Sequence, residues 1–189
     1  MVITKMNNLY VLRHCKTVNN IQNIITGQMD VPIMEGEQIE MNQYNHQGNL
    51  EILCSPLIRC KETVSIFLNN INFVPQVTYC NDLLERNMGE LEGMERSKAI
   101  AKYPEYFIDN KFIYNKTPPH GESYTQLCER VDRFINTLLI KKIMSQNVIL
   151  CSHNHVLKII YLKLMNISSE NNWFKIRFEN GKIYNVFLE

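Results

Sequence analysis

The sequence predicts a single-domain α/β protein, with a three-layer α/β/α architecture built around a mainly parallel sheet. Short runs rich in β-branched and aromatic residues alternate with longer stretches of helical periodicity, which is the pattern of right-handed βαβ crossovers. The run at 147–152 (NVILCS) has no polar alternation, as expected of a strand that is buried on both faces. A length of 189 residues suits one domain, so we expect one unit spanning residues 1–189.

The first half of the chain is expected to begin with a strand at 8–13 (NLYVLR), a β-branched and aromatic run. The polar stretch at 35–47 predicts a helix, and EILC at 51–54 predicts a second strand. Apolar residues recur near helical spacing over 57–69, which predicts an amphipathic helix. A third strand follows at 73–79, where Pro75 favours an edge position because proline cannot donate to the ladder.

The second half begins with an irregular segment that contains a helix near 96–103, and a long helix is expected over about 121–143. A further helix is predicted at about 154–165, after the buried strand. The C-terminal part, with 173–178 and 182–188 flanking Asn180-Gly181, predicts a hairpin.

The composition excludes several functional classes. Hydrophobic residues make up 45% and charged residues 21%, which are globular values. The net charge of +1 argues against a nucleic-acid partner. We expect no membrane partner and a cytoplasmic location, because no apolar run is long enough to span a bilayer and MVITKMNN at the start is no secretory signal. The six cysteines include no CxxC pair and are expected to be reduced thiols.

Polar residues collect where three predicted strands end, and the carboxyl ends of parallel strands share one edge of a sheet. These clusters are Arg13-His14, Ser55-Pro56 with Arg59, and Ser152-His153. Two arginines and two histidines suit a phosphoryl group, because guanidinium binds phosphate oxygens through a rigid fork and imidazole can attack phosphorus. Glu85, in an irregular loop, is the candidate acid that protonates the leaving oxygen.

Six short patterns occur in one order along the chain. They are RHCKTVNN at 13–20, GQMDVP at 27–32, SPLIRC at 55–60, LLERNMGELEG at 83–93, GES at 121–123 and VILCSH at 148–153. In this order they resemble the motifs of the histidine phosphatase (phosphoglycerate mutase-like) superfamily, and the resemblance extends from residue 9 to about residue 160. It implies a phosphoglycerate mutase-like fold and an RHG-type phosphatase of branch 1.

The resemblance also implies an activity, namely hydrolysis of a small phosphorylated metabolite by a metal-independent phosphomonoesterase. His14 would be the nucleophile that becomes phosphohistidine, and Glu85 would protonate the departing alcohol and then activate water. Fixed cationic donors provide most of the catalysis of phosphoryl transfer. No metal or cofactor is expected, because two arginines and a protonated histidine can neutralise the dianion.

The same resemblance implies which residues bind the substrate. Arg13, Arg59 and His153 would bind the phosphoryl oxygens, with Asn20 at the pocket wall. Asn154, directly after His153, is included among the substrate-binding candidates.

The chain departs from the family pattern at two positions where glycine is usual. Cys15 follows the nucleophile, and a positive φ there would strain a residue that has a Cβ. Asn154 follows the second histidine, and asparagine is the residue other than glycine that best accepts a left-handed conformation. Glu92 is expected to be structural. His153 and His155 could form a metal-binding pair, but no set of Asp, Glu or Cys residues accompanies them, so we expect no metal site there.

Two alternatives to a phosphatase stay open. A cofactor-dependent phosphoglycerate mutase needs extra cationic clamps and a long covering insertion, whereas the expected lid, 94–119, is short and has Arg96 as its only arginine. Arg86 nevertheless matches the start of the mutase loop. The second alternative is a catalytically impaired relative that only binds phospho-ligands, with Cys15 as the lesion. The sequence leaves the oligomeric state open, a homodimer included.

Overall fold

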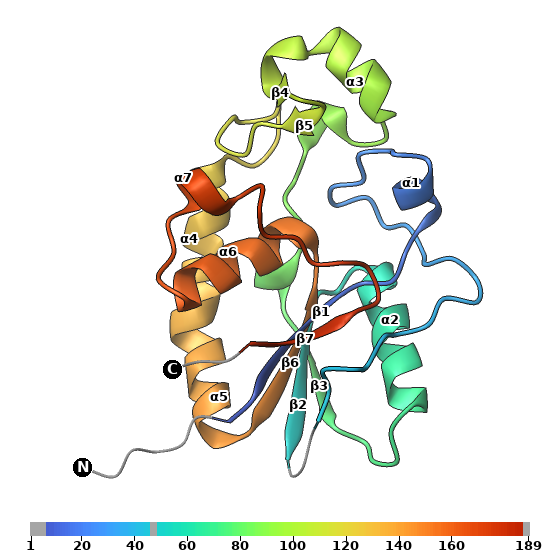
Figure 1. Cartoon of the computed structure of the whole chain (residues 1–189), viewed down its shortest axis with the longest axis vertical. Helices are drawn as coiled ribbons and strands as arrows, with labels where there is room; N and C mark the ends of the chain where they lie inside the picture. Colours follow the sequence, from blue (N-terminus) through green and yellow to red (C-terminus); the bar gives the residue numbers. More distant parts are fainter. Residues whose placement is uncertain (1–6, 46–48, 187–189) are drawn as a thin grey trace.

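The computed structural model describes residues 7–45 and 49–186 and contains one central five-stranded sheet (Figure 1). Its order is β3–β2–β6–β1–β7, with every neighbouring pair parallel except β1 and β7. The strands are β1 (Leu9–Arg13), β2 (Leu50–Cys54), β3 (Gln76–Tyr79), β6 (Asn147–Ser152) and β7 (Ile183–Val186). The predicted α/β/α class with a mainly parallel sheet is confirmed, and β3 has the edge position that Pro75 favoured.

Helices cover both faces of this sheet (Figure 1). One face carries α2 (Ile58–Asn69); the other carries α4 (Tyr124–Phe134), a π-helical turn (Ile135–Leu139), α5 (Ile140–Ser145) and α6 (Asn154–Leu164). The four-residue helices α1 (Val18–Ile21) and α7 (Ser169–Asn172) lie in the connections. Of the helices described, none is long and apolar enough to cross a membrane.

The two central strands fill both cores because their side chains alternate between the faces. Leu9 of β1 and Leu150 of β6 pack with the α4–α6 layer. Tyr10 and Cys151, one residue further along each strand, pack with α2 on the opposite face. Every residue of β6 is buried, which explains why its sequence shows no polar alternation.

A small substructure lies beyond the carboxyl ends of the strands, at the end of the molecule that also holds α1 (Figure 1). It contains η2 (Gly89–Leu91), α3 (Arg96–Lys102), η3 (Pro104–Tyr106), β4 (Phe107–Ile108) and β5 (Lys111–Phe112). The preceding 3-10 helix η1 (Asn81–Leu83) packs against α4 in the main core. It has its own apolar cluster, which includes Leu91, Ala99 and Phe112. Buried Arg86 donates to the carbonyl oxygens of Tyr114, Lys116 and Glu122. These hydrogen bonds fix residues 114–122, the segment that leads from the small substructure back to α4.

Two expected elements are absent from the described residues. Residues 35–45 form turns with one bridge, Glu40 to Lys182, instead of a helix, and 46–47 lie outside the described residues. Residues 173–178 form no strand, so β7 pairs with β1 and not with a hairpin partner; 187–188 also lie outside. The physical reason is that Trp173 is buried among aromatic rings, which draws this segment over α6 instead of alongside β7.

Candidate functional site

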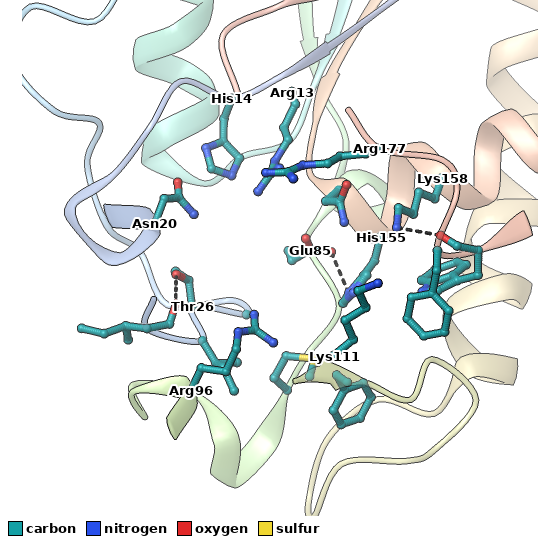
Figure 2. Close-up of a pocket in the computed structure, with 18 of the residues that line it drawn as sticks. Arg13, His14, Asn20, Thr26, Glu85, Arg96, Lys111, His155, Lys158 and Arg177 are labelled. Carbon is teal, nitrogen blue, oxygen red and sulfur yellow. Dashed lines mark hydrogen bonds and ion pairs between the residues drawn. The ribbon is translucent and has the colours of Figure 1, made fainter. Parts of the chain in front are cut away.

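A cavity of about 530 Å³ opens between the carboxyl ends of the strands and the small substructure. Its wall brings together six of the residues that the sequence singled out: Arg13, His14, Asn20, Arg59, Glu85 and Asn154. Figure 2 shows His14 and Arg13 at one end of the cavity and Arg96 and Lys111 at the other. One predicted site residue, His153, is not part of this wall.

The His14 ring is held by the backbone that follows it. His14 Nδ1 lies 2.7 Å from the carbonyl oxygen of Cys15, and a carbonyl can only accept, so Nδ1 carries the proton. Nε2 is then left with its lone pair. Burial and the charges of Arg13 and Arg59 keep the pKa of His14 well below its usual value, so the ring is neutral at physiological pH.

Arg59, at the start of α2, is buried and fixed through three donors. Its Nη1 donates to the Met29 carbonyl oxygen at 2.7 Å, its Nη2 to the Gly27 carbonyl oxygen at 2.8 Å, and its Nε to His153 Nδ1 at 3.2 Å. A cation at a helix N-terminus is unfavourable for the helix dipole, and these acceptors offset that cost.

His153 supports Arg59 and has no accessible surface. Its Nδ1 accepts from Arg59, so Nε2 carries the proton and donates to Ser55 Oγ at 2.8 Å. Burial, Arg59 and His14 hold the pKa of His153 well below its usual value. The expectation of a protonated histidine beside the phosphoryl group is therefore wrong here, because an imidazolium could not accept from a guanidinium.

Arg13 reaches the cavity from the end of β1. Its Nη1 donates to the Phe178 carbonyl oxygen at 3.0 Å, while its buried Nε has no hydrogen-bond partner. Burial lowers the pKa of Arg13 to about 10, Glu85 opposes that shift, and Arg177 and Arg59 add to it. The guanidinium stays charged at neutral pH with donors still unused.

Glu85 is the only carboxylate on the described wall of the cavity. Its Oε1 accepts from the Arg86 backbone N–H at 2.8 Å and lies 3.7 Å from His155 Nδ1. The loop that carries it is held by Arg130, which donates to the carbonyl oxygens of Asp82 and Leu84. Arg130 is itself paired with Glu122 of the GES motif through two short contacts.

The loop at 27–32 also borders the cavity, and hydrogen bonds from residues of the sequence motifs hold it in place. Glu92 Oε1 accepts from the backbone N–H groups of Gln28 and Met88, as its expected structural role requires. A Cβ on Gly27, where φ is +50°, would come within 2.0 Å of that oxygen, so glycine is required. Asp30 Oδ1 accepts from the Ile58 N–H at 2.6 Å and caps the start of α2.

Neither departure from the glycine pattern strains the backbone. Cys15 and Asn154 both lie outside the left-handed region. Cys15 N–H donates to Thr63 Oγ1 at 2.8 Å, and burial raises the pKa of its thiol to about 11. The Cβ of Cys15 therefore gives no reason for a displaced His14.

The cavity wall also carries a second group of cations, which we call the outer cations: Arg96, Lys111, Lys158 and Arg177. Sequence reasoning named Arg96 as the arginine of the lid but assigned none of the four to the site. Arg177 comes from the segment after α7, and Lys158 lies one turn into α6 (Figure 2). Burial lowers the pKa of Lys158 to about 8, and Arg13 adds to the shift while Glu85 opposes it. Nothing in the local sequence marks Lys111 or Arg177; only the fold brings them to the cavity.

The described residues contain no group of three or more His, Cys, Asp or Glu side chains arranged to hold a metal ion. The cavity chemistry is instead cationic, with six arginine and lysine side chains against Glu85. Such a wall suits a ligand that carries more than one negative charge.

Comparison with known proteins gives a consistent result. The model of the histidine phosphatase superfamily (branch 1) matches residues 9–188. A 2,3-bisphosphoglycerate-dependent phosphoglycerate mutase of Cytophaga hutchinsonii is 28% identical over 169 residues, 86% of this chain and 79% of that protein. A metal-independent phosphoserine phosphatase of Arabidopsis thaliana is 28% identical over 177 residues, 89% of this chain and 73% of that protein.

A solved structure from Escherichia coli, provisionally named an alpha-ribazole-5'-P phosphatase, has the same fold. It superposes with a TM-score of 0.80 at 22% identity and covers 96% of this chain and 90% of that chain.

Proposed function

The chain belongs to the histidine phosphatase superfamily (branch 1), and on that premise we propose that it is a phosphomonoesterase acting through a phosphohistidine on His14. The observation that carries the proposal is the 2.7 Å hydrogen bond from His14 Nδ1 to the Cys15 carbonyl oxygen. It leaves Nε2 as an unprotonated nucleophile in a cavity lined by Arg13 and Arg59. Phosphatases and mutases of this superfamily are similar to this chain over most of its length.

In the first step, the Nε2 lone pair of His14 attacks phosphorus and the bond to the leaving oxygen breaks. Glu85, in its protonated form, gives its proton to that oxygen as the alcohol departs. The negative charge on the transferred group is stabilised by Arg13 and Arg59, whose positions are fixed before the reaction begins. The Nδ1–H of the phosphorylated ring keeps its bond to the Cys15 carbonyl oxygen.

In the second step, the Glu85 carboxylate takes a proton from water, and the resulting oxygen nucleophile attacks phosphorus as the bond to His14 Nε2 breaks. Phosphate leaves, and both side chains return to their starting states. Asn20 stays a proposed contact of the phosphoryl oxygens from the α1 side of the cavity. His153 acts in this proposal through Arg59, which it holds, and not by direct contact with substrate.

A second candidate, a cofactor-dependent mutase, is favoured by the outer cations. The short lid segment contains Arg96 and Lys111, and Lys158 and Arg177 reach the same cavity from other elements. These groups can bind a second anionic group on the substrate, which a mutase also requires. We therefore extend the proposal to a small phosphate monoester with a second negative charge.

The test is hydrolysis of 4-nitrophenyl phosphate in the presence of EDTA, followed by assays with 3-phosphoglycerate, with and without 2,3-bisphosphoglycerate. We expect phosphate release in EDTA and release faster than formation of 2-phosphoglycerate. Isomer formation that outruns phosphate release would establish the mutase, and no turnover of any phosphate ester would leave a binding protein.

A further inference from the structure

His155 has no role in the mechanism above, although its ring lines the cavity beside Glu85. Its Nδ1 is buried without a hydrogen-bond partner and lies 3.7 Å from Glu85 Oε1 (Figure 2). A lone pair at Nδ1 would face a carboxylate oxygen at this distance, which is repulsive. A proton at Nδ1 turns the same contact into an N–H donor directed at the carboxylate.

The ring is held in this orientation from its other side. His155 stacks on Trp173, with ring centroids 5.5 Å apart and planes 29° apart. Lys158, three residues along α6, donates to the Trp173 carbonyl oxygen at 2.8 Å, so both side chains meet the same buried residue from one face of the helix. The imidazole is therefore supported by the protein alone, without a substrate.

The two oxygens of Glu85 are unequal in this arrangement. Oε1 already accepts from the Arg86 N–H at 2.8 Å, and the contact to His155 is to the same oxygen. Two donors on Oε1 fix the plane of the carboxyl group and leave Oε2 to meet the leaving oxygen. Closure of the contact to a hydrogen bond needs a shift of under about 1 Å, and such bonds often tighten only when substrate is bound.

We propose that His155 is a positioning residue for the general acid: its Nδ1–H donates to Glu85 Oε1 and directs Oε2 at the leaving group. The inference rests on the proposed function of Glu85. Because His155 then stabilises the carboxylate formed when the proton departs, it assists most where the leaving group is poor and proton donation is most needed.

Protonation of His155 itself is not part of this role. Burial lowers its pKa to about 4, against the opposing charge of Glu85, so the ring is a neutral donor at pH 7. The charged groups that interact with Glu85 come from several elements and are unchanged by substitution at 155: Arg13 of β1, Arg59 of α2, Arg86 of the same loop and Lys158 of α6.

Two substitutions distinguish the role of the Nδ1–H donor from the role of ring stacking on Trp173. His155→Asn keeps an amide donor near Nδ1 and loses the stacking on Trp173, whereas His155→Phe keeps the stack and loses the donor. We expect His155→Phe to reduce the ratio of kcat on an alkyl phosphate to kcat on 4-nitrophenyl phosphate by about 10- to 100-fold.

His155→Asn should keep the ratio within a few-fold of wild type, and His120→Asn, at an exposed histidine with no contact to the cavity, is the matched control. The opposite order, with Asn impaired and Phe normal, or an equal loss on both substrates, would overturn the proposal. Thermal unfolding of each variant identifies losses that come from stability alone.

A readout without turnover keeps this inference separate from the proposed function. The ¹⁵N chemical shifts of the His155 ring at pH 7 report its tautomer, and we expect the proton on Nδ1. In Glu85→Gln the pKa of His155 should fall further, since the opposing carboxylate is gone. A proton on Nε2 in the wild-type protein would contradict the positioning role of His155, even if the enzyme is active. A proton on Nδ1 in a protein without activity would contradict only the proposed phosphomonoesterase function.

Discussion

The two ends of the cavity are built differently. At the inner end, the His14 ring and the Arg59 guanidinium are fixed by backbone carbonyl oxygens. At the outer end, within the described residues, Arg96 makes no side-chain hydrogen bond or ion pair, and Lys111 only lies over the Phe174 ring, 5.4 Å from its centroid. Arg177, whose side chain lies beside Arg13 (Figure 2), also makes no side-chain hydrogen bond or ion pair in the part of the chain that the structure describes. The inner groups hold their geometry without a ligand, whereas Arg96, Lys111 and Arg177 make no ion pair within the described residues. Lys158 differs from them, because it donates to the Trp173 carbonyl oxygen.

This difference separates chemistry from specificity. Transition-state charge is stabilised best by donors that need no reorganisation, which describes the inner end. Cations without a hydrogen-bond partner in the protein can adapt to substrates of different length, and we expect them to contribute mainly to binding. Changes at the inner end should therefore reduce kcat, and changes at the outer end should raise KM.

The largest effect is expected at the nucleophile. His14→Gln removes the nucleophilic lone pair of Nε2, because an amide nitrogen is not nucleophilic. The variant keeps a polar side chain of similar size. We expect kcat on 4-nitrophenyl phosphate to fall roughly 10⁴-fold or more, as when other enzymes lose their nucleophile. Full turnover by this variant, measured by released nitrophenol, would mean that His14 is not the nucleophile and that the inner end does not carry the chemistry in this way.

The next effect is expected at Arg59. Arg59→Lys keeps the charge but cannot reach Gly27, Met29 and His153 at once. We expect a loss of about 10²–10³-fold in kcat and a lower Tm, because buried carbonyl oxygens lose their donors. Arg133→Lys, at an arginine whose side chain is 65% exposed, is the matched control and should change neither. If Arg59→Lys alters only KM, the inner end is no more rigid than the outer end.

A smaller effect is expected at the outer cations. Arg177→Gln and Lys111→Gln should each raise KM about 10-fold for a phosphate ester with a carboxylate, and raise it much less for 4-nitrophenyl phosphate. Lys98→Gln, at a lysine whose side chain is 79% exposed, is the control on α3. Equal changes in KM for both substrates would show that Arg177 and Lys111 do not bind a second anionic group of the substrate.

The smallest effect is a pH dependence of binding. Burial lowers the pKa of Lys158 to about 8, so its charge is present below pH 8 and lost as the pH rises through 8. We expect KM for a substrate with two anionic groups to rise a few-fold between pH 7 and pH 9. Lys158→Met should raise KM at pH 7 and flatten this rise. A rise of the same size in Lys158→Met would assign it to another group.

The sequence predicted the central sheet because its strands carry local signals: β6 is apolar throughout and Pro75 marks the edge. It also located the residues at the strand ends, since parallel strands bring these together at one edge. The helix expected at 35–47 failed because a polar stretch without apolar periodicity carries no real helical signal.

The remainder of the site depended on contacts that no local pattern contains. The sequence marked His153 correctly as a strand-end residue, but its ring nitrogens bond to Arg59 and Ser55 within the protein. Arg177 reaches the cavity because Trp173, four residues earlier, is buried against Tyr114 and Tyr124. Aromatic packing over α6 overrode the strand propensity of 173–178.

The central claim is that His14 Nε2 carries the phosphoryl group, and rapid-quench trapping with ³²P-labelled substrate tests it most directly. The account predicts label on the wild-type protein that is lost in acid and stable in alkali, that maps to His14 by mass spectrometry, and that is absent from His14→Gln. Turnover without any such label, or label that persists in His14→Gln, would contradict it.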